Sequence, residues 1–165
     1  MTTIELIADA CARSAQWMKM TLGDFSEADM LVRPVPAANH TAWQVGHMLA
    51  GEVFMVNMIA PGTMPSLPPA FFKLHEDPKA SSKVDDPKAF PSKEQLFKLL
   101  DEVRGATVKW IKTLTPEQLA QPAPEKMKEY APTVMHLVLL LMSHTSMHAG
   151  QMQVIRRKLG KPILF

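Results

Sequence analysis

The feature that most constrains the fold is a stretch that begins at Asn39 or His40, runs to about Ala60 and is apolar on nearly all sides. A Pro-Gly pair then ends it. A helix with apolar residues all round is buried on most of its surface. The rest of the chain must therefore supply helices to surround it. A polar residue inside such a helix needs a partner, and His47 is such a residue.

Three further stretches repeat apolar residues every three or four positions, which predicts amphipathic helices. Thr2 with Glu5, and Ser92 with Gln95, have the spacing of capping boxes at helix starts. The helices are predicted over Thr3 to Leu22, about Lys93 to Leu114, and Thr133 to Leu159. No stretch alternates with the period of a strand. The sequence therefore predicts an all-α protein, a four-helix bundle in a single domain over residues 1–165.

A long connection, residues 61–91, separates the second and third predicted helices and contains seven prolines. Connections longer than about 15 residues are uncommon and are usually functional or crossover segments. We expect this one either to cross the bundle or to cover the mouth of a pocket.

Composition excludes several classes of partner. The formal net charge is +2 and no dense basic patch occurs, so neither nucleic acid nor an anionic membrane is favoured. The longest apolar run, Leu137 to Met142, is far shorter than the roughly 18 residues of a membrane span. One cysteine excludes an internal disulfide, and Cys11 lies on an apolar stripe as a buried thiol. Without a recognisable signal peptide, a cytoplasmic location is expected.

The last predicted helix carries His144 and His148, four residues apart on one face. This spacing lets two imidazoles reach one metal ion, although a pair of ordinary core histidines has the same pattern. His47 strengthens the metal interpretation, because an unpaired imidazole in an apolar helix is costly. We therefore predict that His47, His144 and His148 bind one divalent metal.

Two other residues are candidates for the pocket or for support of the ligands. Trp43 precedes His47 by one turn, and Gln151 follows His144 by two turns. Of the other histidines, His40 begins its helix, His75 lies in the connection, where it can be exposed, and His136 lies about 12 Å from His144 along the helix axis. We do not expect these three to be ligands.

Three protein ligands leave coordination positions open, as catalytic metal sites do. We expect Zn²⁺ as the metal. Ni²⁺, Fe²⁺ and Mn²⁺ remain possible, because nitrogen ligands alone do not distinguish these ions. The nearest carboxylate on the His47 helix, Glu52, lies about 140° around the helix axis and points away from it. The sequence therefore provides no carboxylate with the spacing of a general base.

These residues resemble the DinB/YfiT-like superfamily of metal-binding four-helix-bundle proteins. The resemblance rests on three segments. Residues 39–49 contain His47, residues 144–151 contain the histidine pair, and residues 156–162 fit the usual ending of the family. It implies the metal triad His47, His144 and His148. Members with known activity include thiol S-transferases that use bacillithiol, mycothiol or glutathione. The connection 61–91 is longer than in compact members.

Several functions remain open from the sequence. The resemblance and the open site favour a metal-dependent thiol S-transferase that acts on an electrophilic small molecule. The alternatives are a metal-dependent hydrolase, a non-catalytic metal-dependent protein that binds small molecules or serves in a stress response, and a structural bundle with core histidines. A homodimer is also expected, because the stretches 39–60 and 133–159 carry more apolar residues than one seam needs.

Overall fold

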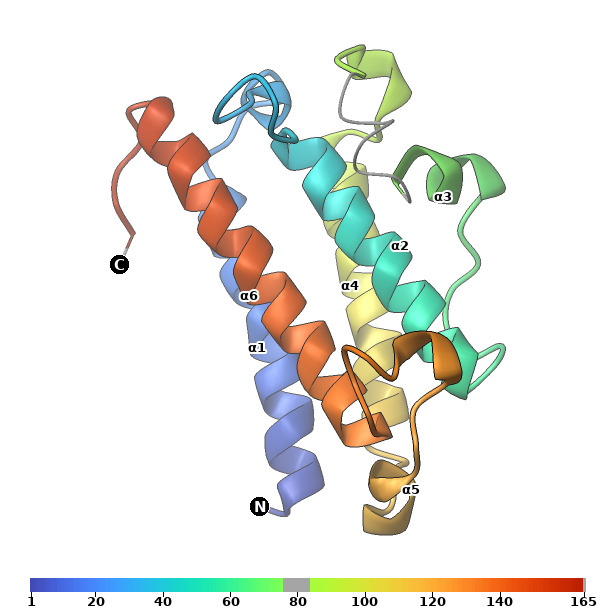
Figure 1. Cartoon of the computed structure of the whole chain (residues 1–165). Helices are drawn as coiled ribbons and strands as arrows, with labels where there is room; N and C mark the ends of the chain where they lie inside the picture. The colour runs from blue at the N-terminus through green and yellow to red at the C-terminus, as the bar shows by residue number, and fades with distance from the viewer. Residues whose placement is uncertain (76–83, 165) are drawn as a thin grey trace.

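The computed structural model describes residues 1–75 and 84–164. Four long helices form a bundle, α1 (Thr3–Leu22), α2 (Thr41–Ile59), α4 (Lys93–Ile111) and α6 (Val134–Lys158). Helix α1 packs against α4 and α6, and α2 packs against the same two helices. Figure 1 shows that α1 and α6 run in one direction and that α2 and α4 run in the other. The predicted all-α four-helix bundle is confirmed.

Shorter elements occupy the connections. They are η1 (Asp29–Leu31), α3 (Pro69–His75), η3 (Pro87–Ala89), α5 (Pro116–Ala120) and η4 (Glu125–Met127). Because α2 and α4 run in the same direction, the connection between them must return the chain along the length of the bundle, and its helix α3 lies beside α2 (Figure 1). The connection therefore crosses over, and it also covers one face of α2.

The predicted helix starts follow from local hydrogen bonds. Thr2 with Glu5, and Ser92 with Gln95, form the expected capping boxes. Helix α1 has the predicted bounds. Helix α4 ends three residues before the predicted Leu114, because the amide of Leu114 donates to the carbonyl of Ile111, three residues back, in a tightened last turn.

Gly160 ends α6 as its place in the sequence predicts. Its φ of +67° lies in the left-handed region, which glycine adopts without a steric penalty. The amides of Gly160 and Lys161 donate to the carbonyls of Arg157 and Arg156, which closes the last turn in a Schellman motif.

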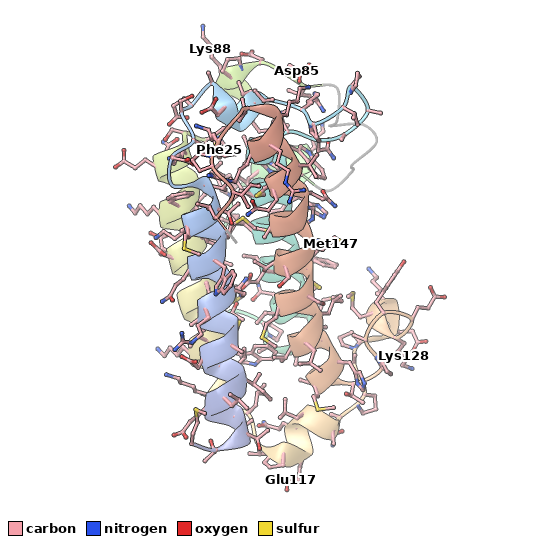
Figure 2. The ribbon with its side chains drawn as sticks, turned by 90° about the vertical axis from the view of Figure 1, so that its left-hand side faces the viewer. Phe25, Asp85, Lys88, Glu117, Lys128 and Met147 are labelled. Carbon is pink, nitrogen blue, oxygen red and sulfur yellow. The ribbon has the colours of Figure 1, made fainter. Side chains whose placement is uncertain are left out.

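Burial agrees with the apolar sequence of α2. Within this helix, Phe54 is the only exposed residue. Helix α6 leaves several large apolar residues exposed, namely Met135, Leu139, Met147 and Val154. Figure 2 shows Met147 on α6, with α1 beside this helix. Apart from Phe54, the apolar residues of α2 are therefore buried or partly buried within the chain, and the homodimer stays a prediction. Among the described residues, no helix is both long enough and apolar enough to cross a membrane.

Candidate metal centre

The structure brings together the three predicted histidines. His47 lies in the second turn of α2, opposite His144 and His148 on α6. One ring nitrogen from each residue lies within 4.8 Å of the other two. The closest pair is Nε2 of His144 and Nε2 of His148, 3.1 Å apart. His148 is buried, and the other two rings are partly exposed.

A glutamine on α2 fixes the proton of His148. Nε2 of Gln44 donates to the carbonyl of Asn39 at 2.7 Å, which assigns the two ends of the amide. Oε1 of Gln44 therefore accepts, and Nδ1–H of His148 donates to it at 3.0 Å. The proton of His148 is thus on Nδ1, so its Nε2 presents a lone pair to the other rings.

The main chain of α3 fixes His47 in the same way. Nδ1 of His47 lies 2.9 Å from the carbonyl oxygen of His75. Because a carbonyl can only accept, Nδ1 carries the proton and Nε2 is left with a lone pair. An outer acceptor that holds a ring in this tautomer is the usual support of a metal-bound histidine.

Burial keeps the rings of His144 and His148 neutral. Burial first, and then positive charge on His144 and His47, lower the pKa of His148 to about 3. Burial, and then His47, lower the pKa of His144 to about 4. At neutral pH both rings are therefore uncharged, as metal ligands must be.

The donor set fits a divalent cation. The lone pair of His148 faces Nε2 of His144, and His47 presents a third nitrogen nearby. Without a metal, His144 can satisfy one of these nitrogens by donating a proton to it. A cation satisfies all three together, because each neutral imidazole offers a lone pair to the same region. The site would hold such an ion through His47, His144 and His148.

Helix α3 is attached to α2 through the residues around His47. The ring of Trp43 stacks on that of His47, with centroids 4.8 Å apart and planes at 11°. Nε1 of Trp43 donates to the carbonyl of Leu74 at 3.0 Å. Trp43 and His47 therefore bind the carbonyls of Leu74 and His75, which the helix itself cannot satisfy at its C-terminal end. The prediction that Trp43 lies at the site agrees with this placement.

His75 corrects an expectation. The sequence suggested an exposed loop residue, but the ring is fully buried. Nδ1 of His75 donates to the carbonyl of Phe71 at 2.7 Å. A Cβ added to Gly46 would lie 2.2 Å from Nε2 of His75, so the ring occupies space that only a glycine leaves. The sequence analysis missed this contact because the contact joins α2 to the connection 61–91, for which no helix was predicted.

The role predicted for Gln151 stays a prediction. Its side chain is exposed, and no hydrogen bond among the described residues joins it to the three rings. Spacing along α6 suggested it, whereas the amide that contacts His148 comes from Gln44 on α2. A signal was available, since Gln44 is a polar residue in a helix that is apolar nearly all round.

The two remaining histidines lie outside the cluster. His40 caps α2, where its Nδ1 accepts from the amide of Trp43 at 3.2 Å. His136 is exposed in the first turn of α6, 2.8 Å from the hydroxyl of Thr133. Neither residue belongs to the group of three histidines whose ring nitrogens converge.

Glu52 belongs to a separate buried cluster. One of its carboxylate oxygens pairs with Arg104 at 2.8 Å, and the other accepts from the hydroxyl of Thr107 at 2.6 Å. No hydrogen bond among residues 1–75 and 84–164 joins a carboxylate to the three rings. Glu52 therefore points away from His47, as its spacing predicted, and is not positioned as a base.

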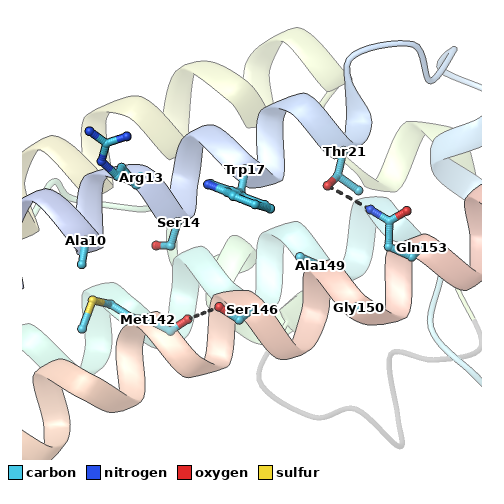
Figure 3. Close-up of a pocket in the computed structure, with 10 residues that line it drawn as sticks. All are labelled: Ala10, Arg13, Ser14, Trp17, Thr21, Met142, Ser146, Ala149, Gly150 and Gln153. Atoms are coloured by element: carbon cyan, nitrogen blue, oxygen red, sulfur yellow. Dashed lines mark hydrogen bonds between the residues drawn. The ribbon is translucent and has the colours of Figure 1, made fainter. Parts of the chain in front are cut away.

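Two of the cavities bear on the position of the three histidines. One, of about 630 Å³, runs between α1 and α6 beside the ring of Trp17 (Figure 3). None of the three histidines lines it. The other, of about 300 Å³, lies between α2 and α3 and has His47 in its wall. The smaller cavity is therefore the one adjacent to the candidate metal centre.

Comparisons with known proteins agree with this description. A conserved protein from Enterococcus faecalis has a similar structure, with a TM-score of 0.72 at 18% identity over 98% of this chain and 99% of that one. YfiT from Bacillus subtilis, described as a probable metal-dependent hydrolase with an unusual four-helix bundle topology, has a TM-score of 0.66 at 17% identity over 98% and 91%. A search of curated proteins gave no significant match. The family model of the DinB superfamily matches residues 12–152, and the chain belongs to this superfamily.

Proposed function

We propose that this protein is a metal-dependent enzyme that transfers a low-molecular-weight thiol to an electrophilic small molecule. The observation that carries the proposal is the orientation of the rings. Acceptors outside the cluster hold the Nδ1 protons of His47 and His148, so both Nε2 atoms are directed to the space that His144 shares. A structural role for these histidines needs no such arrangement.

His47, His144 and His148 would hold a divalent ion such as Zn²⁺, which would supply the Lewis acidity that lowers the pKa of a bound thiol or water. Gln44 and the carbonyl of His75 hold the rings in the required tautomer. Helix α3 and Trp43 cover His47 and limit its access to water.

The choice of a thiol rests on the missing base. Activation of a water benefits from a positioned base. Glu52, the carboxylate on the same helix as His47, is held by Arg104 and Thr107 instead. A thiol bound to a metal loses its proton without a separate base. Hydrolysis is the second candidate, and the description of YfiT as a probable metal-dependent hydrolase favours it.

The first test is metal content. Elemental analysis by mass spectrometry should find close to one divalent ion per chain in protein purified without an affinity tag. The His144→Ala/His148→Ala variant should contain none, and the native sample names the metal to use in assays. If neither protein takes up metal after incubation with Zn²⁺ and Ni²⁺, the proposal fails.

The second test separates the functions. Bacillithiol, mycothiol and glutathione are each incubated with an alkylating electrophile, and the free thiol and the thioether product are measured. Transfer predicts product only when protein and metal are both present. Consumption of substrate without thiol would indicate hydrolysis. Binding without consumption in a thermal-shift screen would indicate a non-catalytic binding protein.

A further inference from the structure

The only exposed residue of the otherwise buried helix α2 is a phenylalanine. Phe54 is 49% exposed and follows His47 by seven residues, two turns along the same face. Between the two lie Ala50 and Gly51, the smallest side chains of this face. Between His47 and Phe54, about 10 Å apart along the helix axis, α2 therefore presents only small side chains to the surface.

Helix α3 supplies the opposite wall. Phe72 and His75 line the same cavity as His47, Ala50, Gly51 and Phe54. None of these six residues carries a carboxylate, an ammonium or a guanidinium group. A charged group that entered this cavity would lose water without gaining a counter-charge from its lining.

The cavity has the size of a small ligand. Its volume is about 300 Å³, and an apolar cavity of about 150 Å³ is enough to bind benzene. Space for a ring with a short substituent is therefore available. Gly51 lies beside the histidines as well as in the wall of the cavity, because a Cβ at this position would be in van der Waals contact with Cε1 of His144, 3.8 Å away.

We propose that the cavity between Phe54 and Phe72 binds an uncharged aromatic group of the substrate and thereby places its reactive end beside His47 and His144. This inference rests on the proposed function, since it names the class of electrophile that the site accepts. Phe54 from α2 and Phe72 from α3 both line the cavity, and their rings favour stacking with such a substrate.

The test is binding of two small probes of equal size to metal-free protein at pH 7.5. Benzamide is neutral and benzoate is an anion. Ligand-observed NMR should give a dissociation constant on the order of millimolar for benzamide and at least tenfold weaker binding for benzoate. Equal or tighter binding of benzoate would overturn the proposal.

Two variants locate the probe. Gly51→Leu fills the cavity from its floor and should abolish benzamide binding, whereas Gly105→Leu makes the same change on α4, where a Cβ would meet nothing within 4 Å, and should leave it intact. Phe54→Ala should weaken binding at least fivefold, and Leu139→Ala, another exposed apolar residue, should not. Retained affinity in both Gly51→Leu and Phe54→Ala would refute the assignment.

This experiment fails separately from the proposed function. Because it uses metal-free protein and measures binding, absence of thiol transfer does not alter its result. If the loaded protein transfers thiols to aromatic electrophiles equally well with and without Gly51→Leu, the cavity is not the substrate site although the enzyme activity stands.

Discussion

Two buried polar clusters lie in the same bundle, and they differ in whether opposite charges pair within them. In one, Arg104 and Glu52 form an ion pair at 2.8 Å, and each is also hydrogen-bonded to a neighbouring side chain. In the other, the Nε2 atoms of His144 and His148 face each other at 3.1 Å, while Gln44 holds the Nδ1 proton of His148. A cluster whose charges are paired within it, called here the saturated cluster, stabilises the fold even though Nε of Arg104 has no hydrogen-bond partner among the described residues, whereas converging lone pairs invite a ligand.

The saturated cluster joins all four long helices. From α4, Nη1 of Arg104 donates to the carbonyl of Cys11 at 2.8 Å and to the hydroxyl of Ser14 at 2.6 Å, both on α1. Its Nη2 donates to Glu52 on α2 and to Thr145 on α6. Burial raises the pKa of the Cys11 thiol, which makes it an inert part of this cluster.

The largest expected difference between the clusters is the response to acid. His144 and His148 have folded pKa values of about 4 and about 3, below the ordinary value near 6.5. The unfolded chain therefore binds protons first, so stability is full above pH 6.5 and falls as the pH drops toward the folded pKa values. Each ring should cost about 2 kcal/mol between pH 7.5 and pH 5.

Urea unfolding of metal-free protein at these two pH values measures this loss. The His144→Ala/His148→Ala variant is the control, because it keeps His75 and His40, whose pKa values burial also lowers. It should lose clearly less stability than the native chain. An equal loss in both proteins would mean that the two rings already carry protons in the folded state at pH 5.

The second prediction concerns the saturated cluster. Arg104→Met leaves the carboxylate of Glu52 buried without its cation, which should lower the free energy of unfolding by about 3–5 kcal/mol. In the double variant Arg104→Met/Glu52→Leu no charge is left unpaired, so most of this stability should return. Both free energies come from urea unfolding at pH 7.5.

The double variant also tests the division between the clusters. If the Arg104 cluster is structural, the folded double variant should bind Zn²⁺ with the affinity of the native chain. Loss of metal from this variant, with native circular dichroism, would place Glu52 and Arg104 in the metal site.

The sequence predicts the histidine cluster better than the contacts that support it. His144 and His148 share a face by spacing, and His47 is identified because it is polar in an apolar helix. The partners of these rings are not encoded by spacing. The contact between Gln44 and His148 joins two helices, α2 and α6. His75 contributes a backbone carbonyl, which no pattern of side chains reveals.

In the fold, too, features set by neighbouring residues are predictable from the sequence, whereas contacts between distant residues are not. Capping residues and glycine set the ends of α1 and α6 locally, so these bounds are predictable. The position of α3 depends on Trp43 and Gly46, whose partners lie about 30 residues away in a connection of irregular sequence. Arg104 lies four residues after Leu100 on the buried face of α4, and a charge at such a position indicates a buried ion pair. The periodicity of the sequence does not identify the residue that pairs with it.

The third prediction sharpens the role of Gln44. Gln44→Leu removes the acceptor that holds the Nδ1 proton of His148, and loss of such a partner typically lowers metal affinity by 10- to 100-fold. Gln44→Glu keeps an acceptor at the same place and should recover most of the affinity. Competition with a chromogenic zinc chelator measures both variants. Native affinity in Gln44→Leu would show that the ring needs no outer partner.

The smallest expected effect separates two neighbours in the sequence. Thr145 follows His144, yet its hydroxyl accepts from Arg104 at 2.9 Å and so belongs to the saturated cluster. Thr145→Val keeps the shape and removes the hydroxyl, which should lower the free energy of unfolding by about 1–2 kcal/mol. Thr145→Ser keeps the hydroxyl and should retain that hydrogen bond. Zinc affinity should be unchanged in both, because His144 and Thr145 point to different clusters, and a loss of affinity confined to Thr145→Val would show that the two clusters are coupled through α6.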